Sequence, residues 1–473
     1  MPQLKNAHPG ARLRHRLLAA GATAVLAPVP ALAASFVVTT VADALPAPAG
    51  SLREALNQAN ATAGPHTITF QASGTVALAG DLPFISQSVT IDGTGKRITI
   101  DAQGLYRIFS VQSRKDLVLR GLNLTGANCI SGSLPTSSAS ATCRAGGSAS
   151  LGAAVLTDGG LIVENSTIAG NRGDAGIVYV YASFGDSTKP VAFVNSTVTG
   201  NHSGGLAPIV LLERQAQMVN STVADNVNGR PAFGNVVALA FGSGLRLANS
   251  ILSSSGGPNC SVDAGSSVVD AGGNLSSDAS CGFTQSSSVQ NTLPQLNALA
   301  DNGGDTPTMK PATGSPAIDQ GVNALAVAAP GTTALATDQR GKPRIAPTDG
   351  RVDRGAVEVT PPPTCTAAAS PATLWSPNHK LVDVALAVSP SSGATWSLRS
   401  VTSSEADSGL GKDDLPVDIQ GWASGTADAA GKLRAERYAV DGRRYTFTVD
   451  VRDSDGGIGT CQARVQVLAS QKR

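Results

Sequence analysis

Three aromatic side chains are the first candidates for contact with a ligand. Tyr179 and Tyr181 are two positions apart, so on a β-strand both rings point to the same face, and Phe184 follows closely. Flat apolar rings with a polar edge are suited to stacking on a sugar ring, and we predict a glycan-contact patch at these residues. The alternative is that the rings pack beneath a neighbouring loop, because aromatic side chains bury large areas.

Acidic residues are few in the same part of the chain. Glycoside hydrolysis uses two carboxyl groups that face one cleft, and a polysaccharide lyase needs acids that hold calcium together with a basic proton acceptor. No Asp-Asp pair occurs here, and His202 stands alone. We therefore predict no catalytic residue and a non-enzymatic protein, with a polysaccharide lyase or glycoside hydrolase as the alternative. The acids are Asp158, Glu164, Asp174, Asp186, Glu213 and Asp225.

Two later groups of acidic residues are dense enough to suggest calcium. Neither has the spacing of an EF-hand loop, so we predict no cofactor, and calcium at Asp413, Asp414 and Asp418 is kept as the candidate metal site. For the other group, which includes Asp338 and Asp353, we expect a capping role in which Arg340 pairs with one of these two acids. The full groups are Asp301, Asp305, Asp319, Asp338 and Asp353, and Asp407, Asp413, Asp414 and Asp418.

The six cysteines form three neighbouring pairs along the chain. We predict disulfides within these pairs if the protein is exported, although six cysteines allow 15 connectivities. No CxxC motif occurs, which argues against a zinc site. The expected pairs are Cys129 with Cys143, Cys260 with Cys281, and Cys365 with Cys461.

Residues 1–33 have the pattern of a secretory signal peptide. Four basic residues between Lys5 and Arg16 precede an apolar run from Leu17 to Leu32, and no acid occurs before Ser35. The run is only about 16 residues long and contains prolines, which is less than a membrane-spanning helix requires. We expect cleavage after Ala33.

The mature chain that this predicts has little net charge. Removal of the four basic residues changes the formal charge of +1 to about −3, which argues against nucleic acid as a partner. No later segment has about 18 consecutive apolar residues, so we expect no transmembrane segment in the mature chain. The protein is expected to be secreted, or to lie at the bacterial cell surface or outer membrane.

An internal repeat indicates the fold. Asn165, Asn195, Asn220 and Asn249 are spaced 30, 25 and 29 residues apart, and each is followed by Ser and then Thr or Ile. Apolar residues lie four and two positions before each Asn, which indicates a strand. A further apolar residue lies three positions after it, so the chain must bend there, and Asn tolerates left-handed dihedral angles.

A period of this length predicts a right-handed parallel β-helix, a pectate-lyase-like solenoid, over residues 34–360. Stacked coils would place the four asparagines in one structural ladder about 4.8 Å apart. Asn-Ser-Thr also matches a glycosylation sequon, which is the alternative explanation. Residues 51–60 start with a capping box and have one apolar stripe, so we expect a short helix that covers the N-terminal end of the coils, with a partner-binding helix as the alternative.

Two stretches resemble known families. The segment SLREALNQAN at residues 51–60, with FVVTT before it and TITF after it, resembles the CSLREA-type domain, although the cysteine of that family is missing. The motifs DNGGDTPT at residues 301–308, GSPAID at 314–319, TDQRG at 337–341 and DRGAVE at 353–358 resemble the choice-of-anchor Q domain. The resemblance implies a secreted or surface-displayed bacterial β-helix without a defined activity.

The chain is expected to end in a second domain. Residues 361–364 form a Pro-rich linker, and residues 365–473 show alternating strands typical of an immunoglobulin-like β-sandwich. We expect Cys365 and Cys461 to join its first and last strands. Trp375, Trp396 and Trp422 all fall in this domain and are expected in its core.

These observations predict an all-β protein and lead to a hypothesis about its function. The β-helix is predicted to present an elongated binding face to a polysaccharide, or to a cell-surface glycan or protein, in the manner of an adhesin. The enzymatic alternative predicts a cleft with clustered carboxylates and a basic residue.

Overall fold

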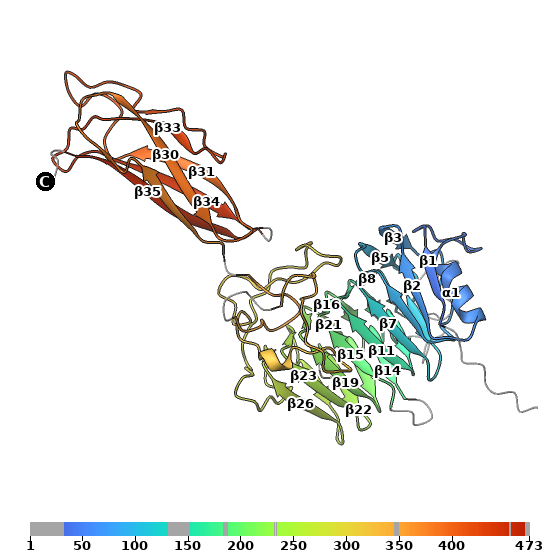
Figure 1. The fold of residues 1–473 in the computed structure, drawn as a ribbon. Coiled ribbons are helices and arrows are strands. Elements are labelled where there is room, and N and C mark those ends of the chain that lie inside the picture. The colour runs from blue at the N-terminus through green and yellow to red at the C-terminus, as the bar shows by residue number, and fades with distance from the viewer. Residues whose placement is uncertain are drawn as a thin grey trace, which may run out of the picture.

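The computed structural model describes residues 33–130, 151–182, 188–230, 232, 234–344, 350–360, 362–453 and 456–468. They form the expected fold class, which is a parallel β-helix followed by two antiparallel sheets (Figure 1). Among these residues, no helix is long and apolar enough to cross a membrane.

The β-helix has three long parallel sheets and one short one. Its strands pair in parallel with the equivalent strands of the coils before and after. The first sheet contains, in order, β1 (Ser35–Val38), β2 (His66–Phe70), β4 (Val89–Asp92), β7 (Asp116–Arg120), β11 (Gly160–Glu164), β15 (Val191–Val194), β19 (Gln215–Val219), β23 (Gly244–Ala248) and β26 (Ser267–Gly272).

The other parallel sheets follow the same rule. The second sheet contains β3 (Gly74–Ala77), β5 (Ile98–Asp101), β8 (Leu122–Thr125), β12 (Thr167–Ala169), β16 (Thr197–Thr199), β20 (Thr222–Ala224), β24 (Ile251–Ser253) and β27 (Leu275–Ser276). The third sheet contains β6 (Phe109–Val111), β10 (Val155–Thr157), β14 (Val178–Tyr181), β18 (Ile209–Leu212), β22 (Val237–Ala240) and β25 (Cys260–Val262). The short sheet contains β9 (Asn128–Cys129), β13 (Arg172–Gly173), β17 (His202–Ser203) and β21 (Val227–Asn228).

Each coil turns a corner between the first and second sheets at the repeated asparagine. Leu161 and Val163 point into the core before the corner, and Ile168 points into it afterwards; all three are fully buried. Asn165 has a φ of 47°, a left-handed conformation that lets the inward phase change without breaking the strand stack. The resulting interior is one continuous apolar cluster from Val38 to Phe283.

A short helix covers the first coil. Helix α1 (Leu52–Ala61) lies beside β1 and β2 (Figure 1). Ser51 accepts a hydrogen bond from the backbone N–H of Glu54, whose carboxylate accepts one from Gly50, which completes a capping box. Leu52 and Leu56 lie in the continuous core, so the helix shields the open end of the solenoid.

The coils end earlier than the sequence suggests. Among the described residues, the last strand of the β-helix is β27, and the rest of the range expected to form coils is irregular apart from a 3₁₀ helix, Asn323–Leu325. We call residues 277–344 and 350–360 the strap. The strap does not continue the coils. It lies on the outside of the β-helix, against sheets that the earlier coils form.

The sandwich consists of two four-stranded sheets. One contains β28 (Cys365–Ser370), β30 (Leu381–Pro390), β33 (Ala430–Arg434) and β32 (Ile419–Gln420). The other contains β29 (Thr373–Leu374), β35 (Ile458–Val467), β34 (Arg444–Arg452) and β31 (Thr395–Ser403). Trp396 and Trp422 pack against the core. Trp375 does not, since it is 46% exposed, and its predicted place in the core is wrong.

Candidate functional site

The strap packs on the outside of the β-helix and covers two of its long sheets. Leu325, Ala329 and Leu335 pack on the outer face of the first sheet. Ala317 and Leu296 pack against Ile251 and Leu275 of the second sheet. Within the described residues, no such apolar cluster joins the strap to the third sheet.

The predicted aromatic residues lie on the outer face of the third sheet. Tyr179 and Tyr181 both point outward from β14, with ring centroids 6.0 Å apart in an edge-to-face arrangement. Tyr179 is only 8% exposed, because Gly152 and Gly176 lie close to its side chain. Tyr181 is partly exposed. Tyr179 therefore supports Tyr181 from below, and Phe184 lies outside the described residues.

A hollow of about 250 Å³ opens beside Tyr181. Phe84, which is 55% exposed, forms part of its wall together with Leu156. Phe84 reaches the hollow because the neighbouring Ile85 bridges to Val111 of β6. Sequence analysis missed Phe84, since it lies outside any strand and carries no periodic signal. The polar wall consists of Arg107, Ser110, Gln112, Ser113 and Asp158.

Arg107 is the cation in this wall, and it is largely occupied. It is 4% exposed, and it donates to the carbonyl oxygens of Leu151 and Gly152 at 2.9 and 3.1 Å. Burial lowers the pKa of Arg107, while the nearby charge of Asp81 acts in the opposite direction. Arg107 therefore fixes the rim of the hollow as well as supplying charge.

Asp158 is the carboxylate in the wall, and it accepts a hydrogen bond from the Ser113 hydroxyl. Behind it, the fully buried Arg214 donates to the carbonyl oxygens of Tyr181 and Asp158. Burial raises the pKa of the Tyr181 phenol, and the charge of Asp158 adds to the effect. These contacts hold an aromatic ring, an acid and several hydroxyl and amide groups around one small space, which suits a polyhydroxylated ligand.

Comparison with known proteins adds little to this geometry. No protein-family model and no curated protein matches the sequence, so the resemblance to the CSLREA and choice-of-anchor families is not confirmed. Among solved structures, the chain is similar to the crystal structure of Jun a 1, the major allergen from cedar pollen. The TM-score is 0.31 and the sequence identity is 14%, over 52% of this chain and 68% of that one.

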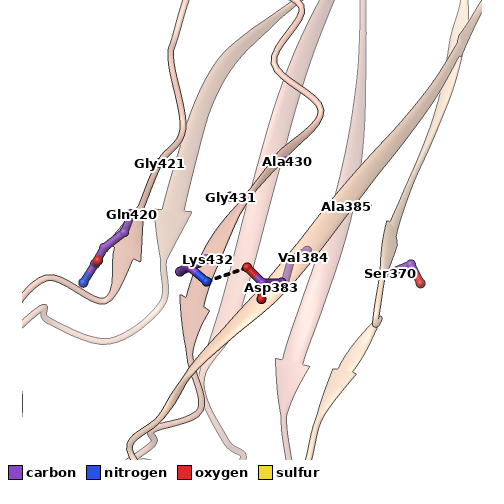
Figure 2. A pocket seen from close by; sticks show the side chains of 9 residues that line it. All are labelled: Ser370, Asp383, Val384, Ala385, Gln420, Gly421, Ala430, Gly431 and Lys432. Atoms are coloured by element: carbon purple, nitrogen blue, oxygen red, sulfur yellow. Dashed lines mark hydrogen bonds and ion pairs between the residues drawn. The ribbon is translucent and has the colours of Figure 1, made fainter.

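The sandwich carries a second, larger hollow of about 570 Å³ on the outer face of its first sheet. Figure 2 shows Asp383 and Lys432 joined across neighbouring strands, with Ser370, Ala385 and Gln420 around them. The ion pair is 2.6 Å long but its side chains are 85% and 48% exposed, so it adds little stability. No aromatic ring lines this hollow, which makes it a weaker candidate for sugar contact than the one at Tyr181.

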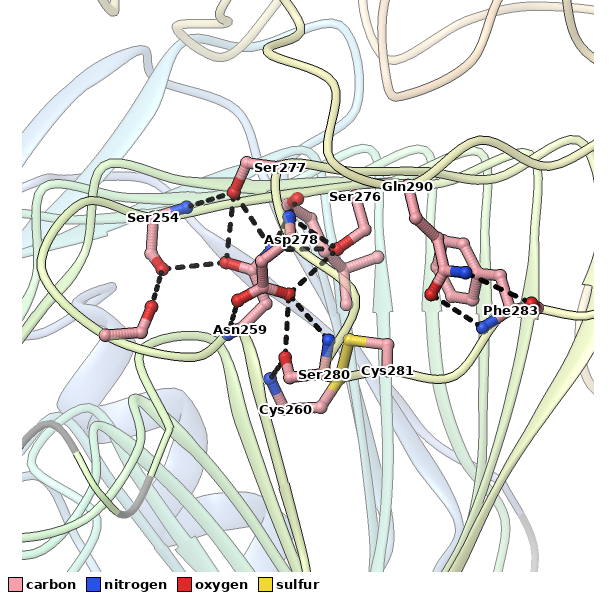
Figure 3. The surroundings of a disulfide bond; sticks show 12 residues. Ser254, Asn259, Cys260, Ser276, Ser277, Asp278, Ser280, Cys281, Phe283 and Gln290 are labelled. Atoms are coloured by element: carbon pink, nitrogen blue, oxygen red, sulfur yellow. Dashed lines mark hydrogen bonds between the residues drawn. A yellow bond between two sulfur atoms is a disulfide. The ribbon is translucent and has the colours of Figure 1, made fainter.

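Two of the three predicted disulfides are confirmed. Cys260 and Cys281 are bonded, with Cα atoms 5.1 Å apart, and they close the last coil beside a hydrogen-bonded group around Asn259 and Asp278 (Figure 3). Cys365 and Cys461 are bonded between the first and last long strands of the sandwich. Cys143, the predicted partner of Cys129, lies outside the described residues.

The four repeated asparagines lie one above another, linked through their backbones. The N–H groups of Asn165, Asn195 and Asn220 donate to carbonyls of the next coil, at Val194, Val219 and Ala248. Among the four, one side-chain bond joins two members, from Asn249 to Asn220 at 3.4 Å, so the predicted amide ladder does not run through this row and the side chains hold the strap instead. Asn195 donates to the Thr337 carbonyl, Asn220 to that of Asp353 and Asn249 to that of Val322, at 2.8 to 3.1 Å.

This arrangement affects whether the Asn-Ser-Thr motifs can be glycosylated. Asn195 and Asn220 are at most 2% exposed and their amides are engaged with the strap, which leaves no access for a glycan. The continuous amide ladder is instead formed by a second row of asparagines, which lies in the turn between the second sheet and the short sheet. Asn171 donates to Asn201 at 3.0 Å, and Asn201 donates to Asn226 at 2.9 Å, with all three essentially fully buried.

The acidic groups are engaged in ion pairs and caps. Arg340 forms an ion pair with Asp338 at 2.9 Å, which is one of the two pairings expected from the sequence. Asp418 contacts both Arg434 and Arg443, and Asp414 shares a hydrogen bond with Glu436. Within the described part of the chain, no group of three or more potential metal ligands converges.

Proposed function

We propose that this is a secreted or cell-surface β-helix protein that binds a glycan in the hollow on its third sheet. The observation that carries the proposal is the meeting of Tyr181 and Phe84, from distant coils, in one hollow with an acid, hydroxyls and an amide. The described part of the strap packs on the other two long sheets, which supports the choice of this one. The resemblance of residues 51–60 and 301–358 to surface-displayed bacterial β-helices supports the proposed location and does not bear on the ligand.

A glycan array followed by titration calorimetry tests the proposal. Removal of one stacking ring is expected to lower affinity about tenfold, which corresponds to about 1.4 kcal/mol. We expect this for Tyr181→Ala and for Phe84→Ala. Phe241→Ala is the matched control, because Phe241 is 68% exposed on the β-helix but does not line the hollow. Equal affinities for all three variants would remove the hollow from the proposal.

The enzymatic alternative has a specific residue to test. Asp158 is the acid that lines the hollow, so a lyase or hydrolase would depend on it. The assay is release of unsaturated or reducing sugar from a polysaccharide panel. Release by the wild type that is abolished in Asp158→Asn, while the fold is retained, would replace the binding proposal with a catalytic one.

Export is proposed from the signal pattern and the two disulfides, which form in oxidising compartments. Expression in a bacterial host and N-terminal sequencing of the exported product are expected to give Ala34 as the first residue. An uncleaved product that stays in the cytoplasm would contradict this part of the proposal.

A further inference from the structure

The two aromatic rings of the hollow on the third sheet come from coils that are three steps apart. Ile85 bridges to β6, β6 pairs with β10, and β10 pairs with β14, each time in parallel. Phe84 directly precedes Ile85, and Tyr181 is the last residue of β14. Neighbouring strands are about 4.8 Å apart, so Phe84 and Tyr181 are separated by about 14 Å along the axis of the β-helix.

The coils between the two rings supply the middle of the hollow. Ser110 of β6 and Leu156 of β10 are partners in the strand pairing, and both line the hollow. Gln112 follows β6 and is exposed, so its amide can donate to and accept from a ligand. The hollow therefore crosses four coils along the axis, with an aromatic ring at each end and polar groups between them.

The hollow presents aromatic, hydroxyl and amide groups and little charge. Among the described residues that line it, the charged ones are Arg107 and Asp158, which are 4% and 5% exposed. Arg107 donates to backbone carbonyls, and Asp158 accepts a hydrogen bond from Ser113. A uronate carboxylate bound here would lose water without an exposed cation to replace it. This composition favours an uncharged sugar.

We propose that the ligand is an uncharged, extended polysaccharide chain that lies along the axis of the β-helix; this inference rests on the glycan-binding function proposed above. An extended 1,4-linked chain advances by about 5 Å per sugar, close to the spacing of about 4.8 Å between coils. Four consecutive sugars then span the hollow. The first and last stack on Phe84 and Tyr181, and Gln112 bonds to hydroxyl groups between them.

Titration calorimetry with oligosaccharides of increasing length tests the proposal. The probes are β-1,4-linked oligomers of glucose, of mannose and of N-acetylglucosamine, because these chains are extended and uncharged. In at least one series, affinity is expected to rise at least tenfold from two to four residues and less than twofold from four to six. Two comparison series are expected to bind at least tenfold more weakly at four residues: α-1,4-linked glucose, whose chain curves, and α-1,4-linked galacturonate, which is charged.

Variants of the two rings test the direction of the chain. A disaccharide is too short to reach both rings, and either end of the hollow can hold it. Phe84→Ala and Tyr181→Ala are therefore each expected to weaken the tetrasaccharide about tenfold and the disaccharide at most about twofold. Phe241→Ala, exposed on the β-helix but outside the hollow, is the control and is expected to keep the wild-type dependence on length. Circular dichroism checks that each variant is folded.

Three results overturn the extended chain and leave glycan binding in place. The first is a disaccharide that binds as tightly as the tetrasaccharide, or that either ring variant weakens tenfold, since one sugar would then contact both rings. The second is tighter binding of the galacturonate series. The third is no binding of any β-1,4-linked series while another glycan on the array binds in a manner that depends on Tyr181. Absence of binding to every glycan on the array removes the proposed function itself.

Discussion

The Thr197 hydroxyl donates a hydrogen bond of 2.6 Å to the side-chain oxygen of Gln339, which lies 142 residues later in the chain. The amide nitrogen of Gln339 donates to the Thr167 and Thr306 hydroxyls at 2.8 and 2.9 Å. One side chain of the strap is therefore bonded to two successive coils and to another part of the strap. The Thr of the repeated Asn-Ser-Thr motif has the strap as its partner.

Gln339→Leu is expected to loosen the strap. The change leaves several buried hydroxyl and carbonyl groups without a partner, at a cost of roughly 1–3 kcal/mol. Urea unfolding measures the loss, and limited proteolysis shows faster cleavage of the strap. Gln58→Leu, on the exposed face of α1, is the control and is expected to change stability by less than about 0.5 kcal/mol. Equal cleavage rates for the two variants would contradict the role of Gln339.

Asn201→Ala is expected to destabilise the β-helix by roughly 2–4 kcal/mol. The change interrupts the amide ladder at its middle member and removes the bonds to Asn171, Asn226 and the Ile168 carbonyl, all within a fully buried turn. Thermal unfolding measures the effect. His202→Ala, at the next and partly exposed position, is expected to cost much less, and similar losses would argue against the ladder.

Arg53→Ala is expected to cost about 3–5 kcal/mol, because it leaves the buried Asp43 without its partner. Arg53 also donates to the Gly80 and Asp81 carbonyls, which ties helix α1 to the second coil. Arg97→Ala is the matched control. Its ion pair with Asp301 is over 60% exposed on both sides, so a loss below about 1 kcal/mol is expected. Denaturant titration of both variants decides the comparison.

Stability of the strap region is expected to fall as the pH rises. Burial raises the pKa of Glu358 to about 8 and that of Asp353 to about 7. Because the folded protein then holds protons that the unfolded chain has lost, stability is highest below the ordinary carboxyl pKa of about 4, falls as the pH rises from there to about 7 to 8, and changes little above that. Each group contributes a slope of at most about 1.4 kcal/mol per pH unit.

Glu358→Gln tests this directly. The amide keeps an acceptor for Arg344 and for the Asp353 N–H but does not titrate. Its unfolding free energy is expected to vary less between pH 5 and pH 9 than that of the wild type. Glu213→Gln, at an exposed position, is the control and is expected to follow the wild type. A Glu358→Gln variant that declines as steeply as the wild type would show that this carboxyl gains no proton on folding.

Part of the candidate site follows from local patterns. The spacing of Tyr179 and Tyr181 predicted a shared outer face, and both lie on it. The pattern did not indicate that Tyr179 is covered, since this depends on Gly152 and Gly176 in adjacent turns. The sequence did not indicate Phe84, because only the stacking of coils brings this residue to the wall of the hollow.

The sequence by itself determined the coil. Alternating apolar residues and an Asn that accepts a left-handed conformation are local properties, and they suffice to fix the strands, the corner and the stacked core. Only the tertiary structure decided which outer faces the strap covers, because the strap reaches its place through bonds between residues more than a hundred positions apart, such as Thr197 and Gln339. Such bonds leave no periodic trace in the sequence, so the covering of the outer faces is a result of the strap's path.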